Sequence, residues 1–392
     1  MNPTQNAGFA RSIGRLERSV LGVKLSEVHR LLPGLLVAAF VALLSNWLSE
    51  YLGVTVMGFE QTPISPVMLA ILLGLITGFV IRLPQALELG LRFAVNKVLR
   101  LGVIMLGIRL TVFDVFRLGA HGVPIVVLCI LGALFFTTRL NSWLRLPDRL
   151  GVLIAAGTSI CGVSAIVATG PAINAEEEEV AYAVAVITVF GLLATLAYPY
   201  AASVIFRRDA LRTGLFLGTA VHDTSQVVGS ATVYGDVFAA PLALDVATVT
   251  KLVRNVFMAA VIPFMTLHYA RVRHEPGESS GKKIDLLGLL PLFVVGFLIA
   301  AVIRSVGDAS IRVGANAFGL WDGETWSSVY SVVGSWAGSL LVLALAAVGL
   351  STDFRRFRGM GIRPFLVGLG AALVVGGVSF IAIALLGSLV TF

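Results

Sequence analysis

GTSICGVSA, at Gly157–Ala165, places glycines, hydroxyl groups and a cysteine where a membrane-spanning helix would normally carry leucine and valine. GTAVHDTSQVVG, at Gly218–Gly229, echoes it. At one constant offset the two stretches and their approaches align in four pairs, Asp148 with Asp209, Gly157 with Gly218, Thr158 with Thr219 and Ser164 with Ser225. Two polar, glycine-opened segments inside an apolar chain predict a binding site within the membrane.

Composition assigns the chain to the all-α integral membrane class. Of its 392 residues 57% are hydrophobic and 13% charged, with a mean hydropathy of +0.92. The net charge of +7 lies in short clusters between apolar runs, which is the positive-inside distribution and excludes a nucleic-acid partner. Cys129 and Cys161 both lie in apolar runs, so neither a disulfide framework nor a metal site is expected.

Apolar runs of spanning length predict about eleven transmembrane helices, two of them broken at the glycine motifs. Basic clusters between them place the N-terminus in the cytoplasm and the C-terminus outside. Residues 1–30 are expected to form a basic cytoplasmic tail and residues 31–392 a polytopic membrane domain, with a flexible cytoplasmic loop at about 271–283. The expected helices are 31–53, 65–82, 91–109, 121–138, 151–170, 180–204, 211–232, 242–268, 285–305, 327–350 and 364–390.

A second pair of similar segments, Gly107–Pro124 and Gly349–Pro364, is expected on opposite sides of the membrane. Similar segments in opposite orientations predict an inverted repeat. The two glycine motifs are separated by one helix, so as spanning segments they would run parallel. A re-entrant first motif would make them antiparallel, but it would turn the basic Arg207–Arg212 loop outward. The spanning arrangement is therefore preferred, and it places the acidic run Ala175–Val180 outside, at a helix start.

Broken helices would expose backbone N–H groups to an anion and carbonyl groups to a cation. The alternative for the first motif is close helix packing through small residues. The candidate substrate-binding residues of the two motifs are Gly157, Thr158, Ser159, Cys161, Gly162, Ser164, Gly218, Thr219, Thr224 and Gln226.

Ionisable residues at membrane depth extend this site. His222 and Asp223 are candidates for binding a coupling proton or sodium ion, and the alternative is a buried cluster that fixes helix packing. Lys251 and Arg254 share one helix face, with Asp245 roughly opposite Arg254. They are therefore expected to contact substrate, with Asp223 or the anion itself as counter-charge, unless they snorkel to the surface.

Nucleotide-binding and metalloprotease motifs are absent from the sequence, and no cofactor is expected beyond a coupling ion. Cys161 is expected to be a small core residue rather than a nucleophile, since no base that could activate its thiol lies near it in sequence. Two other functions stay open: an anion channel, and an intramembrane enzyme using Cys161, His222 and Asp223. The leading expectation is a transporter that is not an enzyme, and ATP hydrolysis is not expected.

Five segments carry a family resemblance: Gly157–Ile166, Glu177–Gly191, Val221–Ala231, Lys251–Asn255 and the GLSTDFRR turn. From about residue 31 onward the chain resembles a bacterial inner-membrane family that bears the provisional name of sulfate exporters. Ser225 departs from that family, where alanine is commoner. The resemblance implies a secondary transporter of the cation:proton antiporter and anion transporter superfamily, with inverted repeats, broken helices and a homodimeric assembly.

Overall fold

The computed structural model describes residues 25–58, 62, 64–81, 83–273, 291–352 and 362–390. Most of the expected basic tail and most of the expected 271–283 loop lie outside these residues, as does much of the Gly349–Pro364 segment. Within the described residues the regular secondary structure is helical, apart from an isolated bridge between Ala317 and Trp321.

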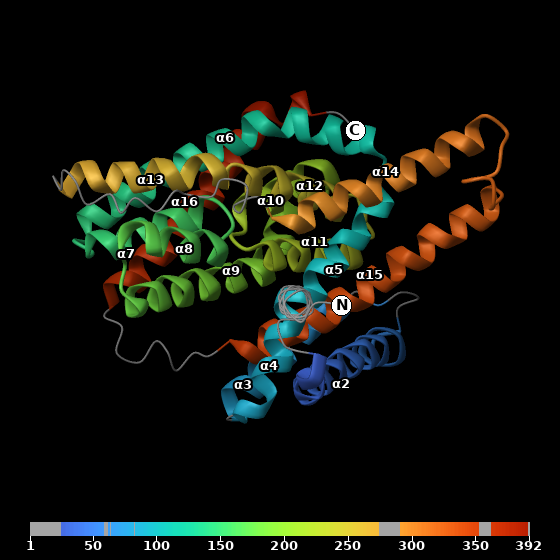
Figure 1. Cartoon of the computed structure of the whole chain (residues 1–392), viewed down its shortest axis with the longest axis horizontal. Helices are drawn as coiled ribbons and strands as arrows, with labels where there is room; N and C mark the ends of the chain where they lie inside the picture. Colours follow the sequence, from blue (N-terminus) through green and yellow to red (C-terminus); the bar gives the residue numbers. More distant parts are fainter. Residues whose placement is uncertain are drawn as a thin grey trace, which may run out of the picture. The chain divides into compact units, whose positions relative to one another are not determined.

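The chain divides into two compact units (Figure 1). Unit 1 contains the described residues up to Gly102 together with Ser335–Thr352, and unit 2 contains Val103–Gly334 and the C-terminal segment. The α-helices are α2 (Leu32–Glu50), α3 (Pro66–Val80), α4 (Gln85–Phe93), α5 (Leu99–Leu106), α6 (Val112–Trp143), α7 (Asp148–Ser159), α8 (Val163–Thr169), α9 (Glu177–Ile205), α10 (Ala210–Ala220), α11 (Thr224–Phe238), α12 (Leu242–Val256), α13 (Met258–Arg273), α14 (Leu292–Arg312), α15 (Gly323–Ser351) and α16 (Ile362–Leu386).

Six helices in the described part of the chain are long and apolar enough to cross a membrane, or seven if the bent pair α12–α13 counts as one span. This is fewer than the eleven expected spans. Each expected segment is wholly or partly helical, but those at 65–82, 91–109, 151–170, 211–232 and 242–268 are short, interrupted or bent. Hydropathy detects apolar runs without showing where a helix stops or folds back.

Unit 1 is held together by glycine contacts between helices. A β-carbon on Gly34 of α2 would lie 2.2 Å from the Leu87 carbonyl of α4, and one on Gly90 would lie 2.2 Å from that of Leu31. Gly74 of α3 packs in the same way against α15, 2.7 Å from the Ala346 carbonyl. Helices in lipid gain stability from such close packing, because lipid chains are as apolar as leucine.

In unit 2, α7 and α8 form a re-entrant hairpin. Arg149 at the start of α7 lies 3.9 Å from Glu176 at the start of α9, although α8 intervenes. A β-carbon on Gly157 would lie 2.8 Å from the Ile166 side chain, so α8 folds back beside α7. With 12 residues, α7 is about 18 Å long, roughly half of a bilayer's thickness.

The helices α10 and α11 form a second hairpin from the other end of the unit. The Arg208 guanidinium, just before α10, lies 5.7 Å from the centre of the Phe238 ring at the end of α11. Tyr200, near the end of α9, also contacts Phe238, with 6.1 Å between ring centres. The 29-residue helix α9 therefore joins two hairpins that enter from opposite ends, and Figure 1 shows α7 and α8 beside α13, and α10 and α11 beside α12.

The spanning arrangement expected for 151–170 and 211–232 is thus wrong, and the two glycine motifs run antiparallel. The acidic run Ala175–Val180 lies at the same end of unit 2 as the start of α7, not at the opposite end. The second break also lacks a glycine: it falls at Val221–Asp223, while Gly218 is inside α10. The three-residue breaks are too short to be recognised as hairpin tips from hydropathy.

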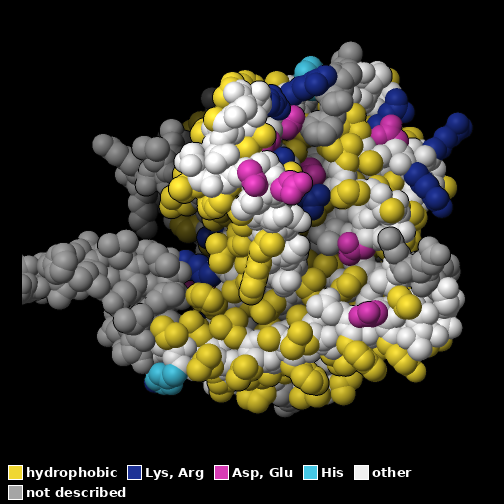
Figure 2. Space-filling view, turned by 90° about the vertical axis from the view of Figure 1, so that its right-hand side faces the viewer, with side chains coloured by type: hydrophobic (Ala, Val, Ile, Leu, Met, Phe, Trp, Pro, Cys, Tyr) yellow, Lys and Arg dark blue, Asp and Glu magenta, His cyan; other side chains and the backbone are white. Residues whose placement is uncertain are grey.

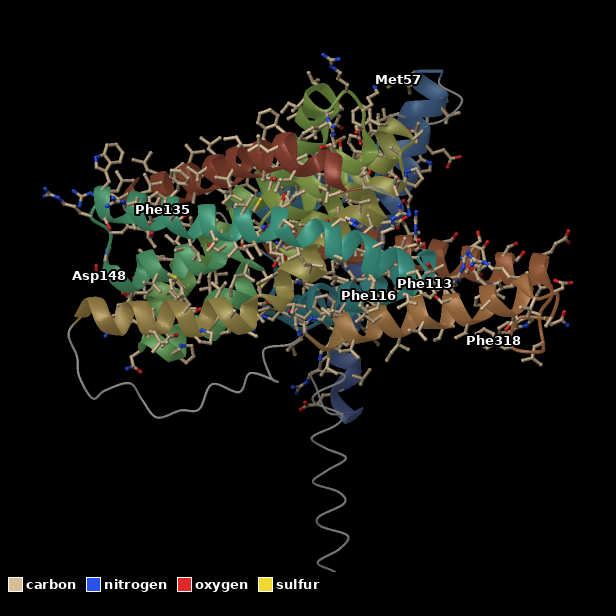
Figure 3. The ribbon with its side chains drawn as sticks, turned by 90° about the horizontal axis from the view of Figure 1, so that it is seen from above. Met57, Phe113, Phe116, Phe135, Asp148 and Phe318 are labelled. Atoms are coloured by element: carbon tan, nitrogen blue, oxygen red, sulfur yellow. The ribbon has the colours of Figure 1, made fainter. Side chains whose placement is uncertain are left out.

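The longer helices of unit 2 surround the hairpins. Tyr198 of α9 donates a hydrogen bond to the Ala372 carbonyl of α16. Phe113, Phe116 and Phe135 of α6 are 77%, 68% and 57% exposed and point outward (Figure 3). Apolar side chains also cover much of the face in Figure 2, where charged residues gather in small patches. Such exposed apolar surface is expected of helices that face lipid.

Candidate functional site

The two hairpin tips meet in the interior of unit 2. Gly162 caps the start of α8 with φ +69° and ψ −118°, a conformation accessible chiefly to glycine. A β-carbon there would lie 3.4 Å from both Cα and Cβ of Asp223, which caps the start of α11. The structure therefore brings the two sequence motifs together.

Lys251 of α12 joins the two tips through backbone carbonyl groups. Its side chain is fully buried, and Nζ donates to the carbonyls of Ile160 at 2.9 Å, of Val221 at 3.0 Å and of His222. An ammonium has three donors, so each has an acceptor. Ile160 and Val221 are also equivalent positions in the alignment of the two motifs.

Arg254, one turn further along α12, makes a matching set of contacts. It is fully buried, and Nε donates to the Ser159 carbonyl at 2.9 Å. One Nη donates to the Thr219 carbonyl at 2.6 Å, and the other to the carbonyl of Thr158. Thr158 and Thr219 are equivalent positions in the alignment of the two motifs. One guanidinium therefore donates to equivalent carbonyls at the ends of α7 and α10.

These contacts identify the counter-charge that the sequence left open. The last carbonyls of α7 and α10 have no helical partner and carry the negative ends of the helix dipoles. Lys251 and Arg254 bind those ends and do not snorkel to the surface. The carboxylate of Asp223 accepts its hydrogen bonds elsewhere, from the backbone N–H of Ser225 at 2.8 Å and from its hydroxyl at 2.6 Å.

Asp223 and Gln226 form a capping box at the start of α11. The Gln226 Oε1 accepts from the Asp223 backbone N–H at 3.2 Å, and its Nε2 donates to the Thr188 carbonyl of α9 at 3.0 Å. Asp223 is only partly buried. A carboxylate at a helix N-terminus offsets the positive end of the helix dipole. Where the hairpin tips meet, the cations Lys251 and Arg254 therefore bind the C-terminal ends of α7 and α10, and the Asp223 carboxylate caps the N-terminal end of α11.

His222 lies at the tip of the second hairpin and is fully buried. Neither ring nitrogen has a hydrogen-bond partner among the described residues. A buried polar group without a partner costs about 1–3 kcal/mol, so such groups usually have a water, an ion or a functional role.

Most hydroxyl and thiol groups predicted to bind substrate face the protein interior. Thr158 and Ser159 donate back to the carbonyls four residues earlier, at 2.6 and 2.5 Å, and Thr219 does the same at 2.7 Å. The Cys161 thiol is 4% exposed and lies 3.4 Å from the Met258 sulfur. Gly157, Gly162, Gly218 and Gln226 are also buried.

Three predicted residues remain accessible at the starts of α8 and α11. Ser164 is exposed, and Asp223 and Thr224 are partly exposed. Asn255 joins them from α12: its Nδ2 donates to the Thr224 hydroxyl at 3.1 Å, while its buried Oδ1 has no partner among the described residues. The sequence shows Asn255 among the polar residues of this helix, one residue after Arg254, but it was not predicted to contribute to the site.

The sequence also missed an ion pair at the start of α12. Arg109 follows α5, and its Nε lies 2.9 Å from the Asp245 carboxylate. The two side chains are 30% and 13% exposed. Asp245 lies roughly opposite Arg254 on the helix surface, and it pairs with a residue 136 positions earlier.

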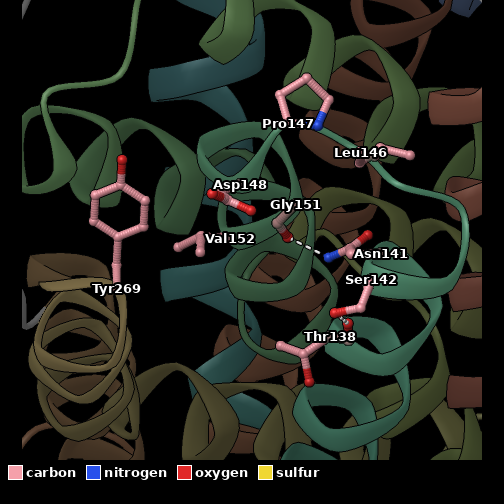
Figure 4. A pocket seen from close by; sticks show the side chains of 9 residues that line it. All are labelled: Thr138, Asn141, Ser142, Leu146, Pro147, Asp148, Gly151, Val152 and Tyr269. Atoms are coloured by element: carbon pink, nitrogen blue, oxygen red, sulfur yellow. Dashed lines mark hydrogen bonds between the residues drawn. The ribbon is translucent and has the colours of Figure 1, made fainter. Parts of the chain in front are cut away.

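A separate cavity of about 140 Å³ lies at the entrance of the first hairpin (Figure 4). Asp148 and Gly151 of α7 line it with Asn141 of α6 and Tyr269 of α13. Asn141 Nδ2 donates to the Gly151 carbonyl at 2.6 Å. The cavity is distinct from the meeting point of the hairpin tips.

Comparison with known proteins gives a family without a named activity. Residues 33–368 match the family described as "Conserved hypothetical protein 698". UPF0324 membrane proteins are similar along most of their length: that of Fusobacterium nucleatum is 30% identical over 300 residues (76% of this chain, 84% of the relative), and that of Corynebacterium glutamicum is 29% identical over 362 residues (92% of each). A UPF0324 membrane protein of Streptococcus pyogenes is 30% identical over 356 residues, covering 91% of this chain and 95% of the relative. No solved structure matches the chain.

Proposed function

This chain belongs to the conserved hypothetical protein 698 family of bacterial multi-pass membrane proteins, and we propose that it is an ion-coupled secondary transporter of a small anion. Sulfate and sulfonates are the proposed substrates, and export is the proposed direction. Both follow the resemblance described above. The proposed location is the inner membrane, as a homodimer with a cytoplasmic N-terminus and an external C-terminus.

One observation carries the proposal: two antiparallel re-entrant hairpins meet tip to tip within an apolar protein. Secondary transporters place their sites where interrupted helices of inverted repeats meet in mid-membrane. Backbone N–H groups at the start of α11 could receive an anion, with Ser164 and Thr224 as hydroxyl donors. In this conformation Lys251 and Arg254 would act by holding the tips in place and not by contacting substrate.

Asp223 is the proposed coupling group, with His222 beside it. An ionised Asp223 itself occupies the positive end of α11 through its contacts with Ser225. Protonation of Asp223, or a cation bound to it, would leave that positive end for the substrate anion. Anion binding and ion binding would then be linked.

Transport by purified protein in liposomes tests this function. Labelled sulfate should show saturable counterflow against internal sulfate or a sulfonate, and the double variant Ser164→Val with Thr224→Val should raise the KM. Ser339→Val, an exposed serine on α15, serves as the control that leaves transport unchanged. Non-saturable flux would indicate a channel, and absence of flux for every sulfate and sulfonate tested would rule out the proposed substrates.

A further inference from the structure

A second cavity, of about 220 Å³, lies at the turn between α14 and α15. Both helices are apolar enough to span a membrane, so their shared turn lies near the membrane surface. The cavity is lined by Asp308, Ile311 and Arg312 of α14 and by Gly323, Trp326 and Tyr330 of α15. None of these residues belongs to the proposed transport site.

Aromatic side chains cluster at this turn. Trp326 stacks on Trp321 with 5.9 Å between ring centres, and Tyr330 meets Trp326 edge-on at 5.9 Å. Phe318 packs against the same ring at 5.6 Å. Tryptophan and tyrosine collect at the depth of lipid headgroups, because one part of the ring is apolar and another forms hydrogen bonds.

The inner wall of the cavity is rigid and its charges are balanced. Trp326 packs directly on Gly307, where a β-carbon would lie 2.5 Å from the ring, and its Nε1 donates to Asp308 at 2.8 Å. Arg304 pairs with the same carboxylate at 2.8 Å and lies over the Tyr330 ring, 3.4 Å from its centre. Asp308 therefore has partners for its charge and leaves none for a ligand.

Arg312 at the rim is different. It is exposed, and among the described residues its guanidinium has no hydrogen bond or ion pair. Asp322 and Glu324, both exposed, lie at the beginning of α15 on the other side of the turn. Val313 and Leu320, 80% and 73% exposed, supply apolar surface next to the rim. Arg312 thus lines the cavity, while the acidic and exposed apolar residues belong to the adjoining turn.

We propose that this cavity binds the headgroup of an amine-bearing zwitterionic phospholipid, phosphatidylethanolamine. Arg312 receives the phosphate through charge-assisted hydrogen bonds. The ammonium is directed towards Asp322 and Glu324, and the acyl chains lie along the apolar surface of α14 and α15. The two carboxylates that flank the lining residue Gly323 disfavour an anionic headgroup.

Native mass spectrometry of the purified full-length chain tests the site, with added phosphatidylethanolamine, phosphatidylcholine or phosphatidylglycerol. We expect phosphatidylethanolamine to bind most tightly and Arg312→Gln to weaken it by about tenfold. Gly323→Leu should block the cavity without disturbing the fold, because a β-carbon there meets only Ile311 Cγ2, at 3.7 Å. Arg145→Gln is the matched control, an exposed arginine at the other end of unit 2.

Equal binding of phosphatidylglycerol would overturn the assignment of a zwitterionic lipid. Unchanged lipid binding in both Arg312→Gln and Gly323→Leu would overturn the site. Inorganic phosphate and phosphoethanolamine form the remaining arm of the experiment. If either competes at the same concentration as the lipid, the occupant is a free phosphate compound and the lipid proposal fails.

Discussion

The backbone carbonyls of Ile160 and Val221 accept hydrogen bonds from the same ammonium group, that of Lys251, at 2.9 and 3.0 Å. The two residues occupy equivalent positions in the two glycine motifs. One buried side chain therefore holds together the tips of two hairpins that enter unit 2 from opposite ends. This arrangement has consequences for stability, topology and transport.

Removal of either buried cation should destabilise the protein strongly. Lys251→Met leaves the carbonyls of Ile160 and His222 without this donor and that of Val221 with only a 3.5 Å contact to Arg254, and Arg254→Met leaves the carbonyls of Thr158, Ser159 and Thr219 without theirs. Loss of about 3 kcal/mol or more is expected for each, because several buried acceptors lose their partners at once. Thermal unfolding in detergent measures the effect against Arg145→Met, which removes an exposed arginine. A variant with a wild-type melting temperature would show that the carbonyls do not need these cations.

The hairpins predict an unusual pattern of cysteine labelling in oriented membranes. Because Arg149 and Glu176 are neighbours, Glu177→Cys and Arg145→Cys should react with an impermeant reagent from the same side. Arg212→Cys and Ala240→Cys should react from the opposite side. Background labelling should be low, since Cys129 and Cys161 are both buried. If Glu177→Cys and Arg145→Cys reacted from opposite sides, residues 148–176 would cross the membrane.

Replacement of Gly162 should be costly for a conformational reason. Gly162→Ala forces a side chain to adopt φ +69° and ψ −118°, with its β-carbon pressed against Asp223. The expected loss is about 1–3 kcal/mol, accompanied by slower transport. Gly377→Ala in α16 is the control, because a β-carbon there meets nothing within 4 Å. Equal melting temperatures for the two variants would show that the tip of the first hairpin tolerates rearrangement.

Asp223→Asn should separate the structural role of this residue from its proposed coupling role. Asparagine is also a good helix N-cap, so the start of α11 should remain folded. It cannot ionise near neutral pH, so anion counterflow should continue while accumulation driven by a proton or sodium gradient is lost. Flux measured with and without the gradient gives the answer. Gradient-driven accumulation that equals wild type would exclude Asp223 as the coupling group.

The ion pair between Arg109 and Asp245 should contribute modestly to stability. Arg109→Gln and Asp245→Asn, singly and together, form a double-mutant cycle whose coupling energy we expect to be about 1 kcal/mol, because the pair is partly exposed. A coupling energy near zero would mean that the two charges are effectively solvated. Melting temperatures of the four proteins supply the measurement.

The sequence by itself determined the class of protein and the two segments at which its helices are interrupted. Apolar runs fix a helical membrane protein, since only helices satisfy their own backbone within lipid over such lengths. The alignment of the two glycine motifs paired Thr158 with Thr219, and in the structure the carbonyls of both accept hydrogen bonds from Arg254. The structure brings His222, Asp223, Lys251 and Arg254 close to the two hairpin tips, and their roles in binding substrate or a coupling ion stay predictions.

Only the tertiary structure decided how the motifs run and what the cations bind. Hydropathy does not distinguish a spanning helix from a hairpin of two half-length helices, because both are apolar over the same residues. The positive-inside rule favoured spanning helices over hairpins, because a hairpin at the first motif would turn the basic Arg207–Arg212 loop outward. The partners of Lys251 and Arg254 are backbone carbonyls, which every residue carries, so no sequence pattern reveals them until the chain has folded.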